Sequence, residues 1–115
     1  MTSDCLFCRI IAGEIPSTSV YQDEDVYAFR DINPAAPTHV LVIPREHISG
    51  ISAAEDAQQA LLGKLMVSAK HIAKTLGLED NGYRLVINNG EQGGQTVYHL
   101  HLHILGGRQM TWPPG

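Results

Sequence analysis

Three histidines occupy alternate positions near the end of the sequence, at His99, His101 and His103. The residues that separate and follow them are aliphatic: Leu100, Leu102 and Ile104. Alternate residues of a β-strand share a face, so the pattern predicts a strand over residues 98–105 with three imidazoles on one side. An unpaired buried polar group costs about 1–3 kcal/mol, which makes a purely structural role for the row the less favoured interpretation.

Two kinds of chemistry use such a row. Neutral imidazole is the commonest metal ligand, and same-face residues about 6.5–7 Å apart along a strand can share one ion. Imidazole is also a nucleophile that can attack phosphorus. The loop just before the row, residues 89–95 with Gly90, Gly93 and Gly94, lets backbone N–H groups approach an anion. Such a loop alone is more often a hairpin turn, but next to three histidines it favours phosphate chemistry.

The two cysteines, Cys5 and Cys8, are spaced C-x-x-C at the start of the chain. In a reducing compartment they are not expected to form a structural disulfide. Three interpretations stay open: half of a metal site, a redox pair, or two small apolar side chains on a helix. The redox pair is the least favoured, because a thioredoxin-like motif needs a preceding strand.

Composition narrows the classes of function. With 115 residues the chain has the size of one domain, and we expect a single domain over residues 1–115. A net charge of −4 without a basic stripe disfavours polymeric nucleic acid, although not a single nucleotide. The apolar runs are too short to cross a membrane, and the N-terminus lacks the order of a signal peptide, so a cytoplasmic location is expected.

The elements that must position these residues can be predicted from pattern. Residues 5–12 read as a short helix with Asp4 as N-cap and Gly13 closing it. Ser19–Gln22 and Val26–Arg30 read as a hairpin, and Thr38–Pro44 as a buried strand.

A helix of about 22 residues is predicted next, between a capping box at Ser52 and Glu55 and a closing Gly77. Its apolar face comprises Leu62, Leu65, Met66, Ala69, Ile72, Ala73 and Leu76. Residues 83–88 form a strand before the glycine loop. The order of elements predicts an α+β domain with a largely antiparallel sheet.

The segment HLHLHIL at residues 99–105 matches the histidine triad signature, in which histidines alternate with apolar residues. The sequence resembles the histidine triad (HIT) family over nearly its whole length, including AFRDI at 28–32, APTH at 36–39, VIP at 42–44, GGQTVY at 93–98 and GGRQM at 106–110. The ending WPPG at 112–115 resembles the Hint branch, the histidine triad nucleotide-binding proteins. The resemblance implies a HIT-like fold: a mainly antiparallel five-stranded sheet with one long and one short helix. It also implies a homodimer, with the sheet continued across it and residues 106–115 at the interface.

The resemblance further implies a hydrolase of purine nucleoside 5′-phosphoramidates that needs no cofactor for catalysis. His101 would attack the α-phosphorus and form a nucleotidyl-histidine intermediate, from which water releases AMP or GMP. His103 and His39 would support the phosphate and the triad. His99 would orient His101 through its carbonyl, and the Thr96 hydroxyl would lie near the leaving group.

Nucleotide contacts are carried over in the same way. The positions of Asn88, Gly94, Gln95 and Val97 match phosphate-side or ribose-side contacts, and Asp31 matches the carboxylate that takes the ribose hydroxyls. Trp112 would reach the site of the partner. The walls of the purine pocket, which could equally be plain core, would be Phe7, Ile10, Phe29 and Ile32.

Some bacterial relatives in this family carry a structural zinc, and the resemblance implies the same ligands here: Cys5, Cys8, His47 and His99. Two thiolates and two imidazoles suit tetrahedral zinc. The alternative is a pair of thiols without metal on an amphipathic helix.

Other functions stay open at this point. The protein could be a nucleotide-binding or scaffold protein with incidental hydrolysis, or a dinucleoside polyphosphate hydrolase. A metal-binding module built on the histidine row is disfavoured, because it would need neither Asp31 nor Thr96 nor the glycine loop. A related transferase branch replaces the third histidine, and the presence of His103 therefore favours hydrolysis.

Overall fold

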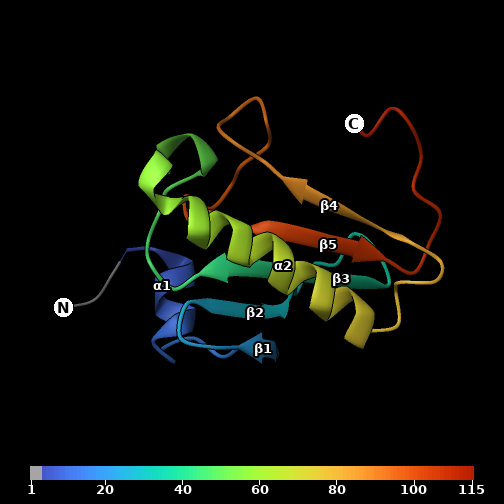
Figure 1. Cartoon of the computed structure of the whole chain (residues 1–115), viewed down its shortest axis with the longest axis horizontal. Helices are drawn as coiled ribbons and strands as arrows, with labels where there is room; N and C mark the ends of the chain where they lie inside the picture. The colour runs from blue at the N-terminus through green and yellow to red at the C-terminus, as the bar shows by residue number, and fades with distance from the viewer. Residues whose placement is uncertain (1–3) are drawn as a thin grey trace.

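One antiparallel sheet forms the middle of the computed structural model, which describes residues 4–115 (Figure 1). Its five strands lie in the order β1-β2-β3-β5-β4. They are β1 (Ser19–Gln22), β2 (Val26–Arg30), β3 (Thr38–Pro44), β4 (Tyr83–Ile87) and β5 (Leu102–Gly106). The short helix α1 (Leu6–Ile11) and the long helix α2 (Gln59–Thr75) complete the predicted α+β fold, which is confirmed.

The two helices cover opposite faces of the sheet, because successive strand residues point to opposite sides. In β3, Val40 and Val42 pack in the core under α2, whereas Leu41 and Ile43 pack in a second core with Phe7 of α1. β3 is therefore buried on both faces, as its continuous apolar sequence predicts. The α1 face is the one that matters for function.

The long helix is shorter than predicted. It has 17 residues and follows two 3₁₀ turns, Ile51–Ala53 and Asp56–Gln58. The capping box joins Glu55 to Gln58, not Ser52 to Glu55, because Ser52 lies inside the first turn and its N–H donates to Asn89 Oδ1 at 3.0 Å. The buried stripe is centred on Ala69 and turns toward Ser68, so that Met66, predicted to face inward, is 48% exposed.

The short helix begins one residue later than expected. Its N-cap is Cys5 rather than Asp4, since Cys5 Sγ accepts a hydrogen bond from the Cys8 N–H at 3.4 Å. Gly13, with φ of +80°, follows the end of the helix in the left-handed conformation that glycine adopts most readily.

The histidine segment differs most from its prediction. The strand was predicted over residues 98–105, but β5 begins at Leu102, and His99 and His101 therefore precede it. The ladder stops because the ring of His99 bonds the carbonyl of Pro44 at 2.8 Å, and the N–H of Leu100 donates to Ile48. The predicted alternation of faces nevertheless holds, because the aliphatic residues all pack in the core under α2: Leu100, Leu102 and Ile104.

Within residues 4–115, no helix has both the length and the apolar character that crossing a membrane requires.

Candidate active site and metal centre

A pocket of about 300 Å³ opens on the α1 face of the sheet. One wall comes from α1 and β2, and the opposite wall from the histidine segment and the end of the glycine loop. The sequence-predicted residues that line it are Phe7, Ile10, Phe29, Asp31, Ile32, Thr96, Val97, His101 and His103. Apolar side chains, one carboxylate and two imidazoles thus share one cavity.

Several predicted nucleotide contacts lie outside this pocket. Gln95 is buried, and its amide contacts only backbone, accepting from the Gly90 N–H at 2.9 Å and donating to Ser49 O at 2.7 Å and Val97 O at 3.1 Å. This side chain braces the glycine loop. The other residues that do not line the pocket are Asn88, Gly94 and Trp112, the last of which is 81% exposed. Their contacts with a nucleotide stay predictions.

His101 has a defined tautomer. Its Nδ1 lies 2.7 Å from the backbone oxygen of His99, and because a carbonyl can only accept, Nδ1 carries the proton. In the neutral ring Nε2 then keeps its lone pair. Phe7 packs against this ring in a T-shaped contact with 5.1 Å between centroids. The ring of His101 is therefore held with an unprotonated nitrogen available.

His39 and His103 form a second chain of hydrogen bonds, which starts from the backbone. The N–H of Ala35 donates to His39 Nδ1 at 3.0 Å, so the proton of neutral His39 is on Nε2. That nitrogen lies 2.8 Å from His103 Nδ1 and 3.5 Å from Asp31 Oδ2. His103 Nδ1 is consequently the acceptor, and the proton of His103 is on Nε2.

The Nε2 atom of His103 is buried and has no hydrogen-bond partner among residues 4–115. A buried donor without an acceptor costs about 1–3 kcal/mol. Since His103 lines the pocket, an acceptor oxygen of a bound ligand could remove that cost. The pocket thus offers an N–H donor from His103 beside the lone pair of His101, with ring centroids 5.0 Å apart.

Burial favours the neutral form of three histidines: His39, His99 and His103. Desolvation, together with the nearby His101 and His39, lowers the pKa of His103 to about 4. Desolvation also lowers the pKa of His39, where the Asp31 carboxylate opposes it, and the pKa of His99. For these three histidines, a neutral imidazole at pH 7 agrees with the tautomer that the hydrogen bonds require.

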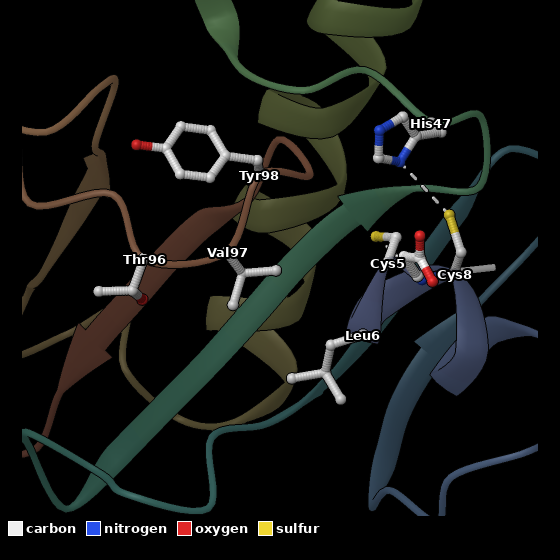
Figure 2. Close-up of a pocket in the computed structure, with 8 residues that line it drawn as sticks. Cys5, Leu6, Cys8, His47, Thr96, Val97 and Tyr98 are labelled. Carbon is white, nitrogen blue, oxygen red and sulfur yellow. Dashed lines mark hydrogen bonds between the residues drawn. The ribbon is translucent and has the colours of Figure 1, made fainter.

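The two cysteines meet two histidines on the same face, next to this pocket. His99 Nδ1 lies 3.4 Å from Cys5 Sγ, 3.5 Å from Cys8 Sγ and 3.2 Å from His47 Nδ1. His47 Nδ1 also lies 3.4 Å from Cys8 Sγ (Figure 2). These are the four ligands that the sequence predicts.

The donor set fits zinc. Bonds of about 2.3 Å to sulfur and about 2.0–2.1 Å to nitrogen at tetrahedral angles place neighbouring ligand atoms roughly 3.3–3.8 Å apart, close to the observed separations. Moreover, His99 Nε2 donates its proton to the Pro44 carbonyl, which leaves the Nδ1 lone pair directed at the cysteines. The Asp31, His39 and His103 group is also compact, but its hydrogen bonds place a proton on His39 Nε2, so it does not match a metal site.

A second hollow, of about 570 Å³, lies between this Cys/His group and the segment from Thr96 to Tyr98 (Figure 2). It shares Leu6, Thr96 and Val97 with the first pocket. Leu6 and Leu41 are lining residues that the sequence analysis missed. Leu41 could have been found, because it lies two residues after His39 in one strand and so shares its face.

Comparisons with known proteins agree with this geometry. A family model described as HIT domain matches residues 12–110. The chain is 57% identical to a "14 kDa zinc-binding protein" of Zea mays, over 98% of this chain and 89% of that protein. A solved "HIT family hydrolase" from Legionella pneumophila superposes with a TM-score of 0.95 at 55% identity, covering 97% of this chain and 100% of that one. A "histidine triad nucleotide-binding protein" from Candida albicans gives 0.82 at 34% identity, covering 96% and 83%.

Acid should destabilise the fold through His103. Its pKa is about 4 in the folded protein and near 6.5 in the unfolded chain, so the unfolded chain binds more protons below pH 6.5. The free energy of unfolding should therefore fall as the pH decreases from about 6.5 toward 4. Urea denaturation at pH 7 and pH 5 should show a loss, up to about 2 kcal/mol of it from His103.

His103→Gln should reduce this loss, and His71→Gln, an exposed change on α2, should not. Equal losses in the wild-type protein and His103→Gln would contradict the assignment.

Proposed function

This protein is a member of the HIT domain family, with the fold of HIT family hydrolases. From that premise we propose that it hydrolyses purine nucleoside 5′-phosphoramidates, cleaving the P–N bond to give AMP or GMP and an amine. The observation that carries the proposal is the pairing, in one pocket, of a lone pair on His101 with an unpartnered N–H on His103.

In the proposed reaction, His101 Nε2 attacks the α-phosphorus, and the P–N bond breaks on the opposite side. The Thr96 hydroxyl donates a hydrogen bond to the departing nitrogen, which takes a proton from solvent as the P–N bond breaks. The bonded imidazole becomes positively charged, and the His99 carbonyl on its Nδ1–H stabilises that charge. The His103 N–H donates to a non-bridging phosphate oxygen as negative charge develops there. Water then attacks phosphorus and loses one proton to solvent, which releases the nucleotide and frees His101.

The remaining walls suit a nucleoside. Phe7, Ile10, Phe29 and Ile32 provide an apolar slot for a purine, and the Asp31 carboxylate at its edge can accept from the ribose hydroxyls. Asp31 Oδ1 already accepts from the Asn33 N–H at 2.8 Å, which fixes the carboxylate's orientation. Asn88, Gly94 and Val97 remain proposed phosphate-side and ribose-side contacts. Gln95, whose amide is bonded to backbone groups, would act on the phosphate side by holding the glycine loop.

Replacement of the nucleophile tests the reaction. With adenosine 5′-phosphoramidate as the substrate, the wild-type protein should release AMP, and His101→Asn should lower kcat/KM by several orders of magnitude. The AMP dissociation constant should change by less than about tenfold, because the pocket walls stay in place. AMP release is followed by chromatography and affinity by calorimetry, with His71→Asn as a surface control.

Other outcomes separate the alternatives. Loss of AMP affinity in His101→Asn would contradict the role given to His101. Nucleotide binding without turnover in the wild-type protein would favour a binding or scaffold role, and turnover of dinucleoside polyphosphates alone would favour that class of substrate.

We also propose that Cys5, Cys8, His47 and His99 hold one structural zinc ion, supported by their separations and by the zinc-binding relative. When bound, zinc would join α1 to the sheet without occupying His101 or His103. The purified protein should contain about one zinc per chain, and added zinc should raise its Tm by binding the folded state. Cys5→Ser with Cys8→Ser should abolish both effects, whereas Arg9→Ala on the same helix should not. Unchanged metal content in the double variant would refute the site.

We propose a homodimer as well. β4 is an edge strand of the sheet, and its last residue, Ile87, is an exposed apolar side chain that lines one small hollow with the exposed Met66 of α2. Trp112 would then reach toward the partner's pocket.

Light scattering after gel filtration should give twice the chain mass of 12.6 kDa. Met66→Asp should shift the mass toward one chain, and Lys74→Asp, a charge change on the last turn of α2, should not. A single-chain mass for the wild-type protein at micromolar concentration would contradict the dimer.

A further inference from the structure

His99 belongs to two networks at once. Its ring atom Nδ1 lies 3.2–3.5 Å from the Sγ atoms of Cys5 and Cys8 and the Nδ1 atom of His47. Its backbone oxygen accepts a hydrogen bond from His101 Nδ1, with 2.7 Å between the two atoms. A single residue, His99, therefore connects the Cys/His group to the ring of His101, whose Nε2 is proposed to attack phosphorus.

The position of the His99 carbonyl depends on how the residue is held. The side chain is fully buried, and Nε2 donates to Pro44 O at 2.8 Å. The ring of Phe7 packs edge-on against both His99 and His101, with centroids 5.9 and 5.1 Å away. The remaining anchor of the ring is its Nδ1 side, which faces Cys5 and Cys8 at the start of α1 and His47 after β3.

That anchor bears on reactivity. The segment that carries His99 and His101 precedes β5 and lacks ladder hydrogen bonds to neighbouring strands. The peptide group between His99 and Leu100 is held instead by the Leu100 N–H, which donates to Ile48 O at 2.6 Å, and by the contacts of the His99 ring. Because Ile48 follows His47 in the chain, the Cys/His group bears on both attachments. If the carbonyl turned away from His101, the proton could move to Nε2, and the ring would present an N–H to phosphorus instead of a lone pair.

We propose that Cys5, Cys8 and His47 are positioning residues for the nucleophile. By holding the ring of His99 through the metal they bind, they keep its carbonyl on His101 Nδ1 and so keep the Nε2 lone pair available. The inference rests on the proposed roles of the metal centre and of His101. It adds that metal occupancy changes turnover through the tautomer of His101, without changing the nucleotide pocket.

A double variant, Cys8→Ser with His47→Ala, tests the coupling while it leaves the Cys5 cap of α1 in place. Zinc content, the ¹⁵N chemical shifts of the His101 ring, and kcat and KM for adenosine 5′-phosphoramidate are measured on each protein. In the double variant zinc should be lost, and the two His101 shifts should move toward the averaged values of exchanging tautomers. Turnover, kcat, should fall about ten- to a hundredfold, the scale of a small misplacement, while KM changes less than about threefold.

The matched control is Arg9→Ala, on α1 but outside the Cys/His group. It should retain zinc, the wild-type His101 shifts and the wild-type kcat.

Zinc loss with unchanged His101 shifts and unchanged kcat would overturn the coupling. If the double variant does not fold, zinc is withdrawn from the wild-type protein with a chelator and then returned. His101 shifts that move and recover support the proposal, and shifts that stay fixed refute it. If the wild-type protein does not hydrolyse the probe, the proposed function fails, and the shifts alone then decide the coupling.

Discussion

A neutral imidazole has one donor nitrogen and one acceptor nitrogen, and a buried one needs a suitable partner for each. In this protein two backbone groups, one carbonyl and one N–H, decide which ring nitrogen of His101 and of His103 carries the proton. The carbonyl of His99 fixes the proton on Nδ1 of His101, whereas the N–H of Ala35, acting through His39, fixes the proton on Nε2 of His103. In one pocket, His101 therefore offers a nitrogen lone pair and the neighbouring His103 offers an N–H donor.

The sheet makes this arrangement possible. β3 and β5 pair in a register that sets His39 opposite Leu105 and Leu41 opposite His103, so His39 and His103 lie on neighbouring strands of one face. The alternation that sends those residues toward α1 sends Val40, Val42 and Ile104 into the core under α2. Apolar packing on one side therefore fixes the polar network on the other, and α1 contributes Phe7 and the cysteines to that second side.

Sequence patterns predicted the features that depend on local chemistry. The β1–β2 hairpin and β3 have the expected bounds, because their β-branched and apolar runs and the turns that bound them are encoded locally. The histidine strand was predicted too long, because alternation reports which face a residue takes and not whether its backbone is paired. The capping box was assigned to Ser52 because Ser52–Glu55 and Glu55–Gln58 both have suitable spacing, and the contact with Asn89 that decides between them comes from the distant glycine loop.

In the candidate site, too, some features could be predicted from the local sequence and others depend on contacts between distant segments. The histidine spacing and the glycine loop indicated phosphate chemistry, whereas the resemblance to the HIT family implied the four metal ligands. The structure brings those four together: Cys5, Cys8, His47 and His99. The role of Ala35 could not be predicted, since a backbone N–H leaves no trace in a side-chain pattern. Gln95 has an amide suited to a ligand, and only the fold shows that backbone groups occupy it.

The strand order has a consequence for how the molecule is made. β5 is the last strand in the chain, yet it lies between β3 and β4, and the bonded pair His39 and His103 is 64 positions apart. Closing so long a loop costs conformational entropy. Strand pairing offsets that cost only when β3 and β4 are both formed and can bond β5. A chain that has not yet reached β5 and the segment before it lacks both pocket histidines of the triad, His101 and His103. Any activity that depends on this pair therefore begins only after β5 has been made and has inserted between β3 and β4.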